Sequence, residues 1–340
     1  MQETKEKNLQ PSEAKVDVKH QVARTLIEAM EQGNTPWQKP WSANALRPKN
    51  PTTNNGYRGI NRVLLGLSGR SSNLWMTYQQ AADKGWQVKK GEKGTMIVKV
   101  VEFDRDGVKE SSGEASSSGQ AEGGDSKNRD NRAFALRRYF VFNAEQIDGM
   151  PVAPEPEGKP FESVERAESM IRAMKEQTGL MVVHGGDRAC YVPSLDEVRL
   201  PPKRAFKTEY DYYSTAAHEI CHSTMHESRL NRGEAYSKKW GDSAYALEEL
   251  TAEIGAAILQ SELGVAPSAE HAKAHLEGHA SYLRSWIKAI EKDPMAIFTA
   301  AKNADKISEY VLGLERQMTA MAPHKEWIAE YDAAPMARMG

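Results

Sequence analysis

The sequence contains few cysteines and no long apolar run, and each shortage excludes a class of protein. Its 340 residues include only 2 cysteines, Cys190 and Cys221, too few for the disulfide framework of a small secreted protein. No stretch approaches the roughly eighteen apolar residues that a membrane span requires. The N-terminal stretch also lacks the continuous apolar core of a signal peptide. With 39% hydrophobic and 27% charged residues, the composition predicts a globular, cytoplasmic protein without membrane contact, long enough for two domains.

The charge is unevenly distributed along the chain. The net charge is −2, but residues 1–100 carry 16 Lys+Arg and 8 Asp+Glu, which leaves a charge of −10 on the rest of the chain. A basic half is what phosphate binding requires, although a modest excess of lysine is also typical of a solvated surface. The opposite signs of the two halves indicate two different tasks.

The most informative stretch is His218-Glu219-Ile220-Cys221-His222, which fits the metallopeptidase pattern HExxH. Residues four apart lie on one face of a helix, so His218 and His222 can direct two imidazoles at one cation while Glu219 reaches the water on that cation. The alternative is an ordinary solvated helix face that matches the pattern by chance. Cys221 lies off the face of the two histidines, so we expect it to be buried as a small apolar residue.

Two histidines cannot hold zinc alone, because a catalytic site takes three protein ligands. The metzincin continuation is excluded, since Met225 and Ser228 stand where that family needs Gly and His. The best source of a third ligand is a predicted helix over 245–263, where Glu249 and Glu253 share one face.

This second helix resembles the second motif of gluzincins. The resemblance implies that Glu249 is the metal ligand and that Glu253 orients a ligating histidine from behind. Glu248 points elsewhere on the predicted helix and is the reserve ligand. A single zinc ion is the cofactor that the combined motifs predict.

Further histidines allow weaker hypotheses. His279 and Tyr282 are candidate donors to a tetrahedral oxyanion, against the plain alternative of polar residues on a helix surface. His271, His275 and His279 follow at steps of four, but no paired carboxylates support a second metal site there. We interpret His226 as a local polar contact.

The pattern of apolar residues predicts an α+β fold of two domains. We expect a disordered tail over 1–17, a small mixed α/β domain over 18–150, a linker over 151–160, a second domain over 161–325 and a tail over 326–340. In the first domain we expect a helix at 18–30, a short helix from Trp75, and strands at 95–103 and 134–142 joined by a flexible excursion over 104–132. In the second domain we expect strands at 180–184, 189–193 and 198–202, and helices at 161–178, 208–226, 245–263, 271–290 and 294–321.

Residues 34–62 interleave aromatic rings with cations among prolines and glycines that prevent a long helix. Such a surface suits single-stranded nucleic acid, because cations follow the phosphates and exposed rings stack on any base. The alternative is that Trp37, Trp41 and Tyr57 are buried anchors of a loop-rich fold. The residues alone favour neither.

Several motifs together resemble the ArdC and TraC-like antirestriction proteins of conjugative plasmids. In the first half they are Pro36-Trp37, Arg47-Pro48, Tyr57-Arg58-Gly59-Ile60-Asn61 and Lys90-Gly91-Glu92-Lys93-Gly94; in the second they are the HExxH helix, Ser228 to Arg232, Glu248 to Gly255, and His279 to Tyr282. The resemblance implies an N-terminal domain that binds single-stranded DNA, fused to a zincin-like metallopeptidase domain, in a protein that shields incoming plasmid DNA from host restriction. It favours DNA contact for the rings of the first half.

We therefore predict a protein that binds single-stranded DNA with little sequence preference and carries a zinc peptidase site, with a host restriction enzyme or another DNA-bound protein as a further partner. The rivals are a DNA-coating protein with an idle zincin domain and a DNA-stimulated protease. The predicted metal ligands are His218, His222 and Glu249, with Glu219 as general base. The predicted DNA-binding residues are Trp37, Lys39, Trp41, Arg47, Lys49, Tyr57, Arg58, Asn61, Lys89, Lys90 and Lys93.

Overall fold

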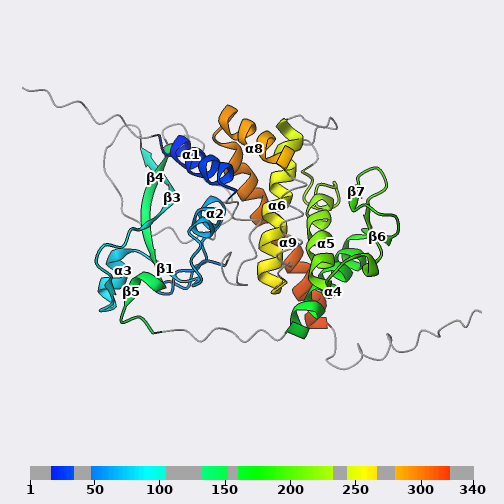
Figure 1. Cartoon of the computed structure of the whole chain (residues 1–340), viewed down its shortest axis with the longest axis horizontal. Coiled ribbons are helices and arrows are strands. Elements are labelled where there is room, and N and C mark those ends of the chain that lie inside the picture. Colours follow the sequence, from blue (N-terminus) through cyan, green and yellow to red (C-terminus); the bar gives the residue numbers. More distant parts are fainter. Residues whose placement is uncertain are drawn as a thin grey trace, which may run out of the picture.

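The computed structural model describes residues 17–33, 47–104, 132–151, 160–232, 243–265 and 280–321. Figure 1 shows a long two-stranded ribbon with its helices on one side of the molecule and a group of helices with a small sheet on the other. The mixture of helices and small sheets confirms the predicted α+β class. None of the helices that the structure describes has the length and apolar character needed to cross a lipid bilayer.

The N-terminal part is built on a three-stranded sheet in the order β1-β4-β3, with β2 and β5 forming a separate pair. The strands β3 and β4 run antiparallel with Thr95 opposite Val141 and Asp104 opposite Arg132, as the two predicted β-rich runs require. Its elements are α1 Val18–Glu31, α2 Ile60–Leu67, β1 Trp75–Met76, α3 Tyr78–Asp83, β2 Gln87–Val88, β3 Thr95–Asp104, β4 Arg132–Asn143, the 3-10 turn Ala144–Gln146 and β5 Ile147–Asp148.

Two local predictions in this part were wrong. Trp75 and Met76 form strand β1 instead of opening a helix, because the helix begins only after Thr77, whose hydroxyl caps it in a reciprocal capping box with Gln80. The helix α2 was not predicted. It begins directly after Gly59, whose positive φ of 56° ends the preceding loop, and at 8 residues it is too short for a clear periodic pattern.

The described residues of the C-terminal part form a small sheet beside five helices. Its sheet has the order β6-β8-β7, with β6 parallel and β7 antiparallel to the central β8. Its elements are α4 Pro160–Thr178, β6 Met181–His184, β7 Cys190–Val192, β8 Glu197–Leu200, the 3-10 turn Lys203–Ala205, α5 Glu209–Ser223, α6 Ser243–Leu263, α8 Ala280–Lys292 and α9 Ala296–Met321. The predicted strands and the helices around the two motifs are confirmed; residues 266–279 of the predicted helix at 271–290 lie outside the described residues.

The helix α6 lies at the centre of the molecule and contributes to two hydrophobic clusters (Figure 1). One side of it, including Leu250 and Ile254, packs in a cluster with Leu26 of α1 and Val63 of α2. The other side, including Ala256 and Leu259, packs in a second cluster with α4 and α5. A helix that is apolar on most of its circumference is typical of a buried position. The two predicted domains therefore share a core across α6, and the bounds given for them remain a prediction.

Ion pairs reinforce this junction. Arg62 of α2, whose side chain is 14% exposed, lies 3.5 Å from Asp305 of α9 and 3.9 Å from Glu262 of α6. Asp305 also accepts a hydrogen bond from the backbone N–H of Gly59 at the start of α2. The first turn of α2 is thereby held on the two long helices of the C-terminal part.

The close approach of α5 and α6 predicts a specific sensitivity at Gly255. A Cβ at position 255 would lie 3.0 Å from the Sγ of the buried Cys221. Gly255→Val should therefore lower the free energy of unfolding by about 1–3 kcal/mol, the usual cost of overpacking a core. Denaturant unfolding checks this, with Gly313→Val in α9 as control, since a Cβ at 313 meets nothing within 4 Å. Equal losses in the two variants would contradict the explanation.

Candidate metal centre

The helix α5 carries two histidines on one face. The helix begins after Thr208, whose hydroxyl accepts a hydrogen bond from the N–H of Asp211, and it buries Tyr212, Ala216 and Ile220 against α4 and α6. Because His218 and His222 are one turn apart, their Nε2 atoms lie 3.1 Å from each other. The local helix spacing alone sets this pair.

Glu249 of α6 completes a set of three ligand atoms. Its carboxylate lies 3.8 Å from Nε2 of His218 and 3.5 Å from Nε2 of His222. All three ligand atoms lie within 4.8 Å of one another. Ligands at about 2.0–2.1 Å from a tetrahedral cation are separated by about 3.3 Å, so the three atoms are spaced as a divalent cation requires. Two imidazoles and one carboxylate are also the donor set of a catalytic metal site with an open position.

A second ring of carboxylates stands behind the histidines. The Nδ1 atom of His218 lies 3.5 Å from Glu253, as predicted for an orienting carboxylate. The Nδ1 atom of His222 lies 3.3 Å from Glu248, which Arg232 in turn contacts at 2.7 Å. Glu248 does point in a different direction from Glu249, as predicted, but it is not a reserve ligand: it contacts Nδ1 on the far side of His222, while Glu249 faces the Nε2 atoms of both histidines.

The cluster carries an excess of negative charge. Burial raises the pKa of Glu219 to about 7, against the opposing effect of His222. Burial lowers the pKa of His222, but its hydrogen bond to Glu248 and the charges of Glu249, Glu248 and Glu219 outweigh this and raise the pKa to about 9. Such an environment favours a cation, since buried carboxylates are costly without positive charge nearby.

Glu219 lies at the boundary between this cluster and the small sheet. Its side chain is buried and accepts a hydrogen bond from the backbone of Tyr191 in β7. The strand β7 is at the edge of its sheet and packs beside α5. The candidate general base is thus placed between the metal ligands and a strand edge. The buried Cys221 confirms the predicted apolar role of that residue.

The tyrosine pair beside Glu249 was only partly predicted. The hydroxyl of Tyr282 lies 3.2 Å from that of Tyr245, and Tyr245 also hydrogen bonds with Glu249. Tyr245 therefore orients the third ligand, a role that the i, i+4 spacing from 245 to 249 would have indicated. His279, with His271 and His275, lies outside the described residues. His226 contacts Ser228 at 2.8 Å, which confirms a local polar contact.

The predicted DNA-binding residues divide into three groups. Trp37, Lys39 and Trp41 lie outside the described residues. Tyr57 and Asn61 make internal contacts: the Tyr57 hydroxyl donates to the carbonyl of Trp75, and the Asn61 amide bonds both the N–H and the carbonyl of Val98 on the outer edge of β3. The structure favours the anchoring interpretation for Tyr57, and it gives Asn61 the task of covering a strand edge.

The cations of the third group lie on the surface. Lys49 is exposed, while Arg47 pairs with Glu262 and Arg58 with Glu309, both on helices of the C-terminal part. Lys89, Lys90 and Lys93 are exposed on the turn before β3.

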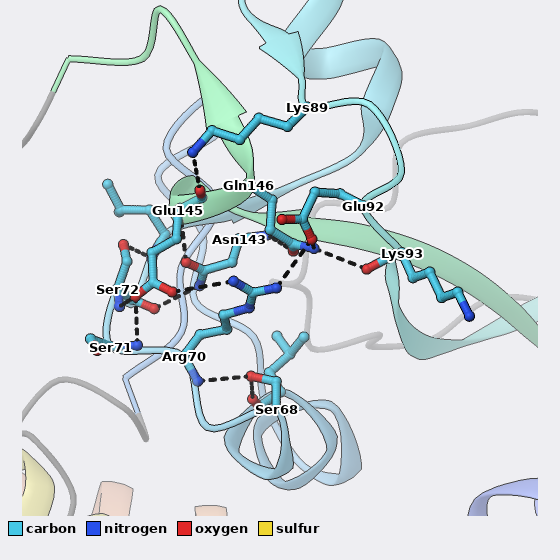
Figure 2. Close-up of polar contacts among 12 residues, drawn as sticks. Ser68, Arg70, Ser71, Ser72, Lys89, Glu92, Lys93, Asn143, Glu145 and Gln146 are labelled. Atoms are coloured by element: carbon cyan, nitrogen blue, oxygen red, sulfur yellow. Dashed lines mark hydrogen bonds and ion pairs between the residues drawn. The ribbon is translucent and has the colours of Figure 1, made fainter.

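A polar network fixes this basic turn, as Figure 2 shows. Glu92 accepts hydrogen bonds from Arg70 and Gln146, and Glu145 accepts from the N–H groups of Ser71 and Ser72. The ammonium of Lys89 bonds the carbonyl of Glu145, while the ammonium of Lys93 points away from the network. The network therefore fixes the backbone of the turn that carries these lysines.

Two protein-family models match the chain, one in its N-terminal part and one in its C-terminal part. The model of the N-terminal domain of anti-restriction factor ArdC matches residues 16–142, and that of a zincin-like metallopeptidase matches residues 165–303. Crystal structures of the antirestriction protein ArdC from plasmid R388, metal-free and Mn(II)-bound, are 32% identical, with TM-scores of 0.66 and 0.64; both matches cover 88% of this chain and 98% of ArdC.

Longer and uncharacterised relatives are also similar. Two Escherichia coli proteins named DNA primase TraC are 40% and 42% identical over 92% and 90% of this chain, but the chain spans only 21% and 28% of their length. Protein y4eC of Sinorhizobium fredii is 32% identical over 87% of this chain and 91% of its own length.

The second ring of carboxylates predicts graded effects on cation binding. Glu249→Ala should abolish stoichiometric binding, because it removes a ligand. Glu248→Gln should weaken binding by about 10- to 100-fold, the usual cost of losing an orienting partner. Titration with Zn²⁺ and with Mn²⁺ by calorimetry measures both. Glu291→Gln, an exposed residue of α8, is the control, and wild-type affinity in Glu248→Gln would show that this carboxylate does not tune the ligands.

Proposed function

The chain belongs to the ArdC family of antirestriction proteins, and from this membership we propose that it binds single-stranded DNA non-specifically and acts as a zinc-dependent peptidase. The observation that carries the proposal is the convergence of His218, His222 and Glu249, with carboxylates behind both histidines. In the cytoplasm of a recipient cell such a protein would protect conjugative DNA from restriction.

The residues of the metal centre have distinct proposed roles. A zinc ion held by the three ligands would supply Lewis acidity toward a carbonyl and toward water. The carboxylate of Glu219 takes the proton from the attacking water and later delivers it to the leaving amine. Glu253 and Glu248 hold the two imidazoles in orientation, and Tyr245 holds Glu249. The hydroxyl of Tyr282, together with His279, is the proposed donor to the oxyanion.

An extended peptide is the substrate class that the surroundings support. The edge strand β7 lies beside α5, and a chain that pairs with this edge would pass along the side where Glu219 lies. Main-chain hydrogen bonds to a strand edge hold an extended segment with little dependence on its sequence. This suits a peptidase whose targets are selected by their position on DNA.

The basic turn supports the DNA-binding half of the proposal. Lys90 and Lys93 are exposed on a turn whose backbone is fixed by Glu92, Gln146 and their partners. Cations that track phosphates bind any sequence, and Trp37, Lys39 and Trp41 remain proposed contributors.

The shared core favours a protease that DNA stimulates over a DNA-coating protein with an idle zincin domain. The cluster containing Leu26 and Val63 also contains Leu250, which directly follows the proposed ligand Glu249. A displacement of α1 or α2 on binding DNA would therefore act on the helix that carries a ligand. A restriction enzyme bound to the same DNA is the proposed target.

The proposed general base gives the first test. Glu219→Gln should lower the rate of peptide cleavage by at least about 10²-fold, because proton transfer is lost, while zinc and DNA binding remain. Cleavage of casein and of restriction-enzyme subunits, with and without a dT oligonucleotide, measures the effect. Wild-type cleavage by zinc-loaded Glu219→Gln would end the mechanistic proposal.

The basic turn gives the second test. In a plot of log affinity against log salt concentration for a dT oligonucleotide, Lys90→Ala and Lys93→Ala should each reduce the slope by about 0.7, the contribution of one phosphate contact to a single strand. Lys288→Ala, exposed on α8, is the control. Unchanged slopes would remove these lysines from the interface, and equal affinity for duplex DNA would contradict base stacking.

A further inference from the structure

Three described aromatic rings of the N-terminal part are at least half exposed, the most exposed being Phe134 of β4 at 67%. Phe140 of β4 is 50% exposed and Tyr78 at the start of α3 is 53% exposed. Between them stands Phe142, half-buried, whose ring centroid lies 6.3 Å from that of Tyr78 at an angle of 69°. Large rings are normally buried in a folded protein, so this exposed pair beside a third ring points to a partner.

The strand β4 aligns two of the three rings, and Tyr78 of α3 contacts the second of them. Phe140 and Phe142 are two residues apart on β4, so they point to the same face at a spacing of about 6.8 Å. Gly94 lies directly before β3, and a Cβ there would lie 3.0 Å from the Cβ of Phe140 and 3.3 Å from Cζ of Phe142. The glycine therefore leaves room for the rings to lie as they do, and a side chain there would displace them.

Positive charge flanks the row at both ends. Arg138 precedes Phe140 by two residues on the same face of β4, and its guanidinium donates to Gln21 of α1. At the other end, Lys93 is exposed and directly precedes Gly94. Figure 1 shows the β3–β4 ribbon running between α1 near one end and α3 near the other.

We propose that Phe140, Phe142 and Tyr78 form a stacking surface for the bases of single-stranded DNA, with Arg138 and Lys93 contacting the flanking phosphates. This rests on the proposed DNA-binding function and adds to the predicted Lys93 four residues that the sequence did not indicate: the three rings and Arg138. Rings in a row with cations at the ends match a polymer of flat bases and phosphates, because every base offers a face for stacking.

The opposite face of the ribbon is the rival location. Tyr139 is 39% exposed there, and Lys99 of β3 lies opposite Arg137 of β4 on the same side of the ribbon. Among the side chains that the structure describes, that face offers one exposed ring, whereas the other face carries Phe134, Phe140 and Phe142, with Tyr78 beside Phe142. Both faces are partly packed, since Ile97 and Val141 lie in a cluster with Trp75 on this face, and Met96 and Val98 pack in the cluster around α6 on the other. The number and alignment of rings therefore favour the Phe140 face.

Adjacent residues on opposite faces make a matched test in the full chain. Phe140→Ala should weaken binding of a dT oligonucleotide by about 5- to 150-fold, the range for losing one base stack, and Phe140→Tyr should retain wild-type affinity. Tyr139→Ala, in the neighbouring position, should bind within about twofold of wild type. Thermal unfolding confirms that each variant is folded.

Oligonucleotides with abasic sites identify stacking as the cause. Removing the bases should weaken binding by the wild type, and the Phe140→Ala substitution should then have no further effect, because the ring and the base form one interaction. A loss on Tyr139→Ala with none on Phe140→Ala would overturn the inference and move the contact to the other face. Wild-type affinity in both variants would also overturn it and would indicate that these rings contact a protein partner instead of DNA. Absence of DNA binding by the wild type would instead defeat the proposed function itself.

Discussion

The buried negative charge between α5 and α6 is the constraint on which the C-terminal structure depends. Four carboxylates face two imidazoles and one guanidinium, and all of them are largely shielded from water: Glu219, Glu248, Glu249, Glu253, His218, His222 and Arg232. Arg232 balances one carboxylate, and protonation of His222 balances part of the rest. A divalent cation held where the three ligand atoms meet would take the place of the proton on Nε2 of His222 and offset more of the negative charge. Cation binding and stability of the folded state are therefore linked, because a cation held only by the folded protein stabilises it.

The same helix that brings the carboxylates also joins the two parts of the chain. Because α6 is covered on both sides, by α1, α2 and α8 through one cluster and by α4 and α5 through the other, its position and rotation are fixed by packing from both parts. The rotation decides that Glu249 faces the imidazole Nε2 atoms while Glu248 reaches the far side of His222. The N-terminal part thus helps to define the candidate metal centre through packing, while none of its described residues is among the three ligands.

Features set by residues close together in the sequence could be predicted, whereas features set by contacts between separate helices could not. The two histidines and the periodic helices were predictable, because their spacing is local to one helix, and so was the choice of Glu249 with Glu253 once a second motif was matched. The task of Glu248, the tie between Tyr245 and Glu249, and the shared core depend on how separate helices pack, which spacing along one helix does not specify. Asn61 shows the same limit: an exposed-looking polar residue in a loop motif proved to bond the edge of β3.

Two arginines that were predicted to bind DNA form ion pairs at the junction between the two parts, yet they remain available to a phosphate group. Arg58, with 67% of its side chain exposed, pairs with Glu309, and the exposed Arg47 pairs with Glu262. Exposed ion pairs contribute only about 0–1 kcal/mol, so a phosphate can replace either carboxylate at little cost. Arg62 differs, because it is mostly buried between Glu262 and Asp305, and losing those partners would leave a charge without compensation. Exchange at the two outer arginines therefore leaves the inner one in place, and a DNA strand held at the junction would not separate the N-terminal part from the helices that carry the candidate metal ligands.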